Sequence, residues 1–249
     1  MLSRNTIENV LLAALSKGGD FAEIYMEESS VSSISMMNGR VDKATSGMDF
    51  GIGIRILEHT KCVYVYSNDI REETLVRLAI DASSSLQSLP ASTSICLNSI
   101  SPYVSNPYRI APVSVAKSEK AEFLRRASEA AKAYDPIISQ TSASYGDVHK
   151  NIWIANSTGL YRSDDRTRTR FMIEAVASSG GEKQSGYFAP GSGKGYEFIE
   201  SFPVEDTARE AARVAVTMIS AKPSPSGKMP VIIDNGFGGV IFHEACGHS

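Results

Sequence analysis

Toward the end of the sequence, two histidines and a glutamate lie within six residues, in the run His243-Glu244-Ala245-Cys246-Gly247-His248. Imidazole nitrogens are common zinc ligands, and a catalytic zinc takes three protein ligands while a fourth position stays open for water. A carboxylate beside such a site is suited to take a proton from that water and to pass it to a leaving amine. These residue types predict metal-dependent hydrolysis, with His243 and His248 as ligands and Glu244 as general base.

The spacing of the two histidines is one residue longer than in the H-E-x-x-H pattern, where both ligands share one helix face. Residues five apart lie about 140° apart around a regular α-helix. A single π-turn, which bonds residue i to residue i+5, would bring both rings to the same side. A helix that ends at Gly247 would also let the second ring turn inward. The motif therefore predicts a local departure from α-helical geometry.

The residues before the motif indicate how it is positioned. Met229–Asp234 is a short apolar run bounded by turn residues, as expected of a buried strand. Asn235-Gly236 predicts a turn, and Phe237–Phe242 supplies small and apolar residues that suit a packed helix. Without this context, both histidines would be interpreted as ordinary structural residues. Cys246 could approach the metal from the same helix face, but we interpret it as a small buried residue.

Composition is that of an ordinary globular chain, with 249 residues, 42% hydrophobic residues, 21% charged residues and a net charge of −3. Nothing in that charge suggests a nucleic-acid partner. Three scattered cysteines, Cys62, Cys96 and Cys246, form no disulfide framework and favour a reducing compartment. The first apolar segment has helical period and is no signal peptide. No apolar run approaches the roughly 18 residues of a membrane span.

Hydrophobic periodicity predicts an α+β fold of mixed helices and antiparallel strands. Asn38-Gly39 suits a type I′ turn between strands at 31–37 and 40–44. Alternation at 52–56 and 63–66 predicts a second hairpin, and Asn68 or Asp69 is expected to cap the next helix. Later helices are expected at 118–134 and 204–220, and strands from 137 to about 187 with turns at Gly146-Asp147 and 157–159. The stretch from 83 to about 115, rich in Ser and Pro, predicts a connecting segment.

Other candidate motifs favour structural interpretations. Arg166, Arg168 and Arg170 share one face of a strand, where they could receive a carboxylate, but pairing with nearby aspartates is preferred. The glycines at 51–53 and 191–195 match neither a dinucleotide fingerprint nor a P-loop, and they predict a strand and a turn. His59 and His149 are expected in a hairpin tip and a strand, with surface or structural roles.

The motif and several upstream segments resemble the TldD branch of the TldD/PmbA metallopeptidase family. The likeness rests on the run from Asp234 to His248, on Gly51–Arg55, on Tyr66–Asp69 and on Ala155–Gly159, and it covers essentially the whole chain. The resemblance implies a cytoplasmic zinc peptidase that acts on unfolded or extended peptides. It also implies a partner, either a second copy or a PmbA-like (TldE) protein that lacks the motif.

The same resemblance implies more chain than this sequence holds. TldD proteins continue past the motif into a second domain, which supplies a cysteine as third zinc ligand, and no residue of this sequence takes that place. We therefore expect three parts: 1–84, a helix–strand unit with two hairpins; 85–222, a helix, strand meander and helix in the same compact domain; and 223–249, the truncated start of a C-terminal metallopeptidase domain.

Two functional hypotheses follow. In the first, the chain belongs to a zinc metallopeptidase of TldD type, with Zn²⁺ bound by His243 and His248 and with Glu244 as base. In the second, the chain is a truncated, catalytically inactive module that binds peptides or a partner subunit. Metal content and peptide hydrolysis distinguish the two.

Overall fold

The computed structural model describes residues 2–86, 94–99, 107–236 and 238–248. The chain forms two compact units, Met1–Ile219 and Ser220–Ser249. Part of the expected connecting segment, including Pro90 and Pro102, lies outside the described residues. The expected division at residues 84/85 and the expected start of a further domain at residue 223 stay predictions.

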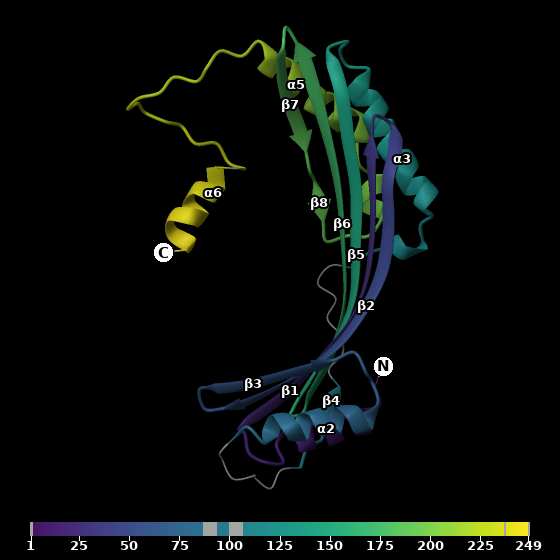
Figure 1. Cartoon of the computed structure of the whole chain (residues 1–249), viewed down its shortest axis with the longest axis vertical. Coiled ribbons are helices and arrows are strands. Elements are labelled where there is room, and N and C mark those ends of the chain that lie inside the picture. Colours follow the sequence, from purple (N-terminus) through teal and green to yellow (C-terminus); the bar gives the residue numbers. More distant parts are fainter. Residues whose placement is uncertain (1, 87–93, 100–106, 237, 249) are drawn as a thin grey trace. The chain divides into compact units, whose positions relative to one another are not determined.

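An antiparallel sheet and several helices build the first unit, which confirms the expected α+β class (Figure 1). The strands are β1 Phe21–Met37, β2 Arg40–Glu58, β3 Lys61–Ser67, β4 Asn98–Ser99, β5 Ile138–Asn156, β6 Leu160–Ser179, β7 Glu182–Phe188 and β8 Gly191–Ser192. The helices are α1 Arg4–Ala14, α2 Glu72–Ser83, the 3-10 turn η1 Pro112–Ser114, α3 Lys117–Lys132, α4 Glu197–Glu200 and α5 Val204–Ile219. Within the described residues, no helix is both long enough and apolar enough to cross a bilayer.

The sheet order is β3-β2-β1-β5-β6-β4, and β7 and β8 also pair with β6. All of these pairs are antiparallel except β4 with β6. The strands β1, β2, β5 and β6 have 17, 19, 19 and 20 residues. At about 3.3 Å per residue, each extends for about 55–65 Å. Strands of this length can serve two hydrophobic cores.

The two cores lie at opposite ends of these long strands. At one end, α1 and α2 cover a core that includes Ile24 and Met26 of β1. At the other, α3 and α5 pack side by side on a core that includes Ile34 and Met36 of the same strand (Figure 1). The residues between them, 27–33, are mostly polar. Because side chains alternate along a strand, the even positions of β1 enter both cores and the odd positions stay on the other face.

Both expected hairpins are present, and the first is longer than predicted. Asn38 and Gly39 have φ angles of 49° and 76°, as a type I′ turn requires. The expected turn at Gly146-Asp147 is wrong, because both residues lie in the middle of β5. Asp147 is buried there beside Lys120 of α3, so its charge serves an ion pair rather than a turn.

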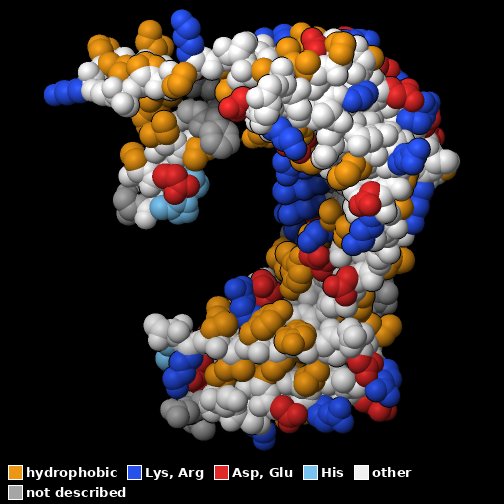
Figure 2. Space-filling view, turned by 45° about the horizontal axis from the view of Figure 1, so that its top comes forward, with side chains coloured by type: hydrophobic (Ala, Val, Ile, Leu, Met, Phe, Trp, Pro, Cys, Tyr) orange, Lys and Arg blue, Asp and Glu red, His pale blue; other side chains and the backbone are white. Residues whose placement is uncertain are grey.

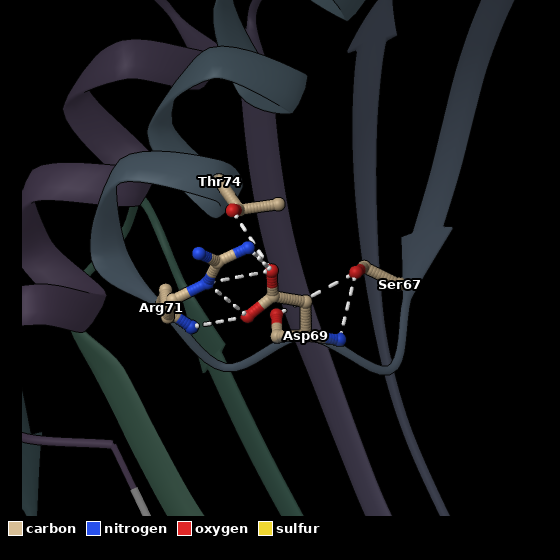
Figure 3. A network of polar contacts seen from close by, with 4 residues as sticks. All are labelled: Ser67, Asp69, Arg71 and Thr74. Atoms are coloured by element: carbon tan, nitrogen blue, oxygen red, sulfur yellow. Dashed lines mark hydrogen bonds and ion pairs between the residues drawn. The ribbon is translucent and has the colours of Figure 1, made fainter.

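The expected cap of α2 is also wrong in detail, because the helix begins one residue after Arg71, which makes no side-chain capping bond. Asp69 instead accepts hydrogen bonds from the Arg71 N–H at 3.0 Å, the Arg71 guanidinium and the Thr74 hydroxyl (Figure 3). The Ser67 hydroxyl accepts a bond from the Asp69 N–H at 2.9 Å. These bonds fix the connection between β3 and α2. The guanidinium of Arg71 holds the pKa of Asp69 well below its usual range.

One ion pair is buried between α3 and the sheet. The Nζ atom of Lys120 lies 2.6 Å from Oδ2 of Asp147, and the two side chains are 2% and 5% exposed. The same Nζ lies 5.0 Å from the centroid of the Tyr145 ring, where the ring face attracts a cation. Burial raises the pKa of Tyr145 well above its usual range, so the phenol stays neutral. Either charge would be costly to bury without the other.

We predict that Asp147→Ala lowers the free energy of unfolding by about 3–5 kcal/mol, because it leaves the Lys120 charge buried without a partner. The double substitution Lys120→Met with Asp147→Val should cost clearly less, since it buries no charge. Arg209→Ala, which removes an exposed ion pair with Asp206, should cost at most about 1 kcal/mol. Urea unfolding of the three variants checks this, and an equal cost for the single and double variants would contradict it.

We also predict a pH-dependent effect for Asp69→Asn. Because its folded pKa is depressed, Asp69 adds stability above its unfolded pKa of about 3.9, and that stability is lost as the pH falls further toward the folded pKa. The variant should therefore unfold at lower temperature than wild type at pH 7, and the difference should shrink at pH 3. Thermal melts at both pH values measure this difference in unfolding temperature. The control is Asp42→Asn, which changes an exposed aspartate of β2. A difference that is unchanged by pH would refute the assignment.

Candidate metal centre

The motif begins where a short helix changes its geometry. Helix α6 covers Gly238–Phe242, and a π-helical turn, labelled η2, covers His243–Gly247. Phe237, which was expected to lead into this helix, lies outside the described residues. The expected π-turn is therefore confirmed.

The π-turn brings the two imidazoles together. Nε2 of His243 and Nε2 of His248 lie 2.9 Å apart, and the ring centroids are 4.5 Å apart at an angle of 86°. Potential ligand atoms of His243, Glu244 and His248 all lie within 4.8 Å of one another. All three residues are exposed, and Figure 2 shows histidine and acidic side chains next to one another on this unit.

This arrangement fits a tetrahedral metal ion closely. Two nitrogens bound to zinc at about 2.0–2.1 Å in a tetrahedron lie about 3.3 Å apart. The observed 2.9 Å requires the rings to separate by only a few tenths of an ångström. The carboxylate of Glu244 is close enough to act beside the two nitrogens. Imidazole nitrogens with a neighbouring carboxylate are a donor set that suits zinc.

Gly247 contributes less to this geometry than expected. Its φ is not positive, and a Cβ added to it would lie 3.5 Å from Nδ1 of His243, which is an ordinary contact. The turn therefore does not require glycine for backbone conformation or for space. The π-helical hydrogen-bond register is what aligns the two rings.

Two expectations around the motif are wrong. Residues 229–234 form no strand, and Ile232 is 99% exposed. Cys246 is exposed rather than buried. Both corrections have the same physical reason. No described residue of 220–248 is buried or in a strand, so these residues offer neither a partner strand for 229–234 nor a core that could cover Cys246. None of the chain's three cysteines forms a disulfide.

Both remaining histidines and Arg166 have the structural contacts that were expected, whereas Arg168 and Arg170 form no ion pair with an aspartate among the described residues. Nδ1 of His59, at the tip between β2 and β3, lies 3.2 Å from Asp20. His149 of β5 lies 2.6 Å from Oδ1 of Asp165. Arg166 pairs with Asp164 at 2.5 Å, as preferred over a ligand role.

A second group of polar residues was missed at the level of sequence. Tyr25, Glu27 and Asp49 line a cavity on the first unit together with Gly51 and Gly53. The two glycines were interpreted only as part of a strand. A usable signal existed, since Tyr25 and Glu27 are two residues apart and must share one face of β1.

Comparison with protein-family models gives two matches in the first unit. Residues 22–86 match the PmbA/TldA metallopeptidase domain 1, and residues 110–219 match the PmbA/TldA metallopeptidase central domain. Together these matches cover most of the chain.

Individual relatives agree with these matches. The chain is 27% identical over 260 residues to a Haemophilus influenzae protein named Metalloprotease TldD homolog, an alignment that covers 99% of this chain and 53% of the relative. It is 30% identical over 237 residues to a metalloprotease of Methanothermobacter thermautotrophicus, covering 92% of this chain and 50% of the relative. The chain thus spans about half the length of these curated relatives.

A solved structure supports the fold. TldE from Thermococcus kodakarensis superposes with a TM-score of 0.60 at 14% identity, covering 85% of this chain and 47% of TldE. At this identity the likeness concerns the fold alone. From the two family-model matches and the relatives named as metalloproteases, we conclude that the chain belongs to the TldD/PmbA family.

Proposed function

We propose that the chain is part of a zinc metallopeptidase of the TldD type, which hydrolyses unfolded or extended peptides. The observation that carries the proposal is the convergence of the His243 and His248 Nε2 atoms, 2.9 Å apart, beside Glu244. Relatives named as metalloproteases support the same reaction class.

Each residue of the motif has a role in this proposal. His243 and His248 would hold zinc, and their Nε2 atoms lie 2.9 Å apart. When bound, zinc polarises the scissile carbonyl and lowers the pKa of a water molecule to about 7. Glu244 takes a proton from the attacking water and passes it to the leaving amine, as a general base and then a general acid. Its carboxylate lies on the same turn as both imidazoles, so it needs no large movement to do so.

The third ligand and the partner belong to the proposal as well. Among the described residues, the group that could hold a metal is His243, Glu244 and His248. With Glu244 as base, two protein ligands remain where zinc takes three. We propose that the third is the cysteine implied by the family resemblance, from outside these 249 residues. As the family resemblance implies, we propose a homodimer or a pairing with a PmbA/TldE-like protein. The three cysteines without disulfides fit the cytoplasm.

The runner-up function is a catalytically inactive module that binds peptides or a partner subunit. It is favoured by one observation, namely that the motif lies in a unit without any buried described residue. Histidine ligands are normally held by hydrogen bonds to their second nitrogen. Among the described residues, neither His243 Nδ1 nor His248 Nδ1 has such a bond.

Zinc titration of the purified chain tests the assignment. We predict that wild type binds zinc and that His243→Ala and His248→Ala each weaken binding by about 100-fold or more, because each removes a ligand. Glu244→Gln should keep zinc and, when the third ligand is supplied, lower hydrolysis of an unfolded fluorogenic protein by about 10²–10⁴-fold, as expected for loss of a general base.

His59→Ala is the matched control, since it removes an exposed histidine outside the motif. If His59→Ala and His243→Ala weaken zinc equally, the binding is adventitious and the proposal fails. Zinc bound at the motif without hydrolysis by wild type, even when the third ligand is supplied, would favour the inactive module. Hydrolysis that survives Glu244→Gln would remove Glu244 from the mechanism.

A further inference from the structure

A cavity of about 610 Å³ opens on the first unit over the strands β1, β2 and β3. Its lining residues on β1, Tyr25, Glu27 and Ser29, occupy odd positions. The even positions Ile24 and Met26 enter the core beneath α1 and α2. Because side chains alternate along a strand, the cavity lies on the sheet face opposite these helices.

Glycines form its floor and tyrosines its sides. Tyr64 lies so close over Gly53 that a Cβ added to this glycine would lie 2.3 Å from the Tyr64 hydroxyl. Gly53 therefore allows the ring to lie across β2. A Cβ at Gly51 would meet nothing within 4 Å, so the floor above Gly51 is open. Tyr66 and Tyr64 are 79% and 58% exposed, which leaves aromatic surface available for contact.

The charge of the lining is negative. It includes the carboxylates of Glu27 and Asp49 and no Lys or Arg. Glu27 accepts a hydrogen bond from the Tyr25 hydroxyl at 2.6 Å and lies 2.7 Å from Lys150, which holds its pKa below the usual range. Asp49 accepts only the N–H of Phe50 and, among the described residues, forms no ion pair. The charge of Glu27 is thus balanced by Lys150, whereas Asp49 has no such partner among the described residues.

Parts of two segments that carry the family resemblance, and that lie outside the metal motif, meet at this cavity. Gly51 and Gly53 belong to one of the upstream segments that carry the family resemblance, and Tyr66, Ser67 and Asn68 belong to another. The network of Asp69, Arg71 and Thr74 fixes the chain just after Asn68 (Figure 3). It also binds the Arg71 guanidinium to Asp69, away from the carboxylates of the cavity.

Exposed tyrosine faces beside an unpaired carboxylate recognise cations. Aromatic rings attract ammonium and guanidinium groups through their faces, and a carboxylate forms charge-assisted hydrogen bonds with the same groups. A guanidinium suits the site best because it stacks on rings and binds carboxylates in a fork. We propose that this cavity binds the basic side chain of an extended peptide, an arginine in preference to a lysine. Only the choice of a peptide as ligand rests on the proposed function.

Peptide titrations of the full 249-residue chain test the proposal. The probes are three blocked pentapeptides that are alanine throughout except for a central arginine, citrulline or glutamate. Their binding is measured by NMR chemical shifts of the protein. Citrulline keeps the shape of arginine and lacks its charge. We expect the citrulline peptide to bind about tenfold or more weakly than the arginine peptide, and the glutamate peptide not to bind measurably. Equal binding of arginine and citrulline peptides would overturn the proposal and indicate a neutral ligand.

Substitutions locate the binding. Three substitutions should each weaken binding of the arginine peptide about tenfold. Asp49→Asn removes the charge, Tyr66→Ala removes a ring, and Gly51→Val fills the floor. The matched controls are Asp42→Asn, Tyr187→Ala and Gly47→Val, which change an exposed aspartate, an exposed tyrosine and an open strand glycine elsewhere on the sheet. Asp49→Asn is the decisive variant because Asp49 is exposed, so the substitution removes the charge without changing any packing contact. Unchanged affinity in Asp49→Asn would overturn the assignment.

A further variant separates this proposal from the peptidase. The double substitution His243→Ala with His248→Ala should bind the arginine peptide as wild type does, because the cavity lies wholly in the first unit. If the wild-type chain binds the arginine peptide but takes up no zinc at the motif, the metal site is refuted and the cavity stays assigned. Lost binding in the double variant would refute the cavity as an independent site.

Discussion

The fold depends on four strands that are long enough to belong to two hydrophobic cores at once. Even positions of β1 supply Ile24 and Met26 to one core and Ile34 and Met36 to the other, with a continuous ladder to β5 and a ladder to β2 that shifts register only between Ser35 and Met36. The period of two must therefore hold across the polar residues 27–33 between the cores. A slip of one residue would turn both apolar sets outward together. The register of the entire sheet is fixed twice, once at each end.

This double constraint leaves the odd positions of β1 free for other roles. Tyr25 and Glu27 cannot enter either core while the register holds, so they are held on the opposite face by packing elsewhere. The same argument applies to Gly51 and Gly53, which lie across from Glu27 and Tyr25 on β2. Rigid strands keep such side chains in position better than loops do. The cavity over β1–β3 is in this sense a consequence of how the sheet is anchored.

Sequence predicted the local features well and the tertiary ones less well. Asn38-Gly39 and the spacing of His243 and His248 carry their own geometry, so the type I′ turn and the π-turn could be expected. Gly146-Asp147 looked like a turn because a strand-interior aspartate is rare, and its partner Lys120 lies 27 residues away. The cavity was missed because its residues come from three strands, and their contacts depend on the tertiary fold rather than on local sequence.

The failed strand at 229–234 shows what limits the metal motif. An apolar run becomes a strand only when neighbours complete its hydrogen bonds and cover its side chains, and no described residue of 220–248 is buried. The π-turn orients His243 and His248 without such support. Where a site lacks packing of its own, the free energy of metal binding is also the free energy that orders it. A bound metal ion would then stabilise a pair of imidazoles that the π-turn has already brought together.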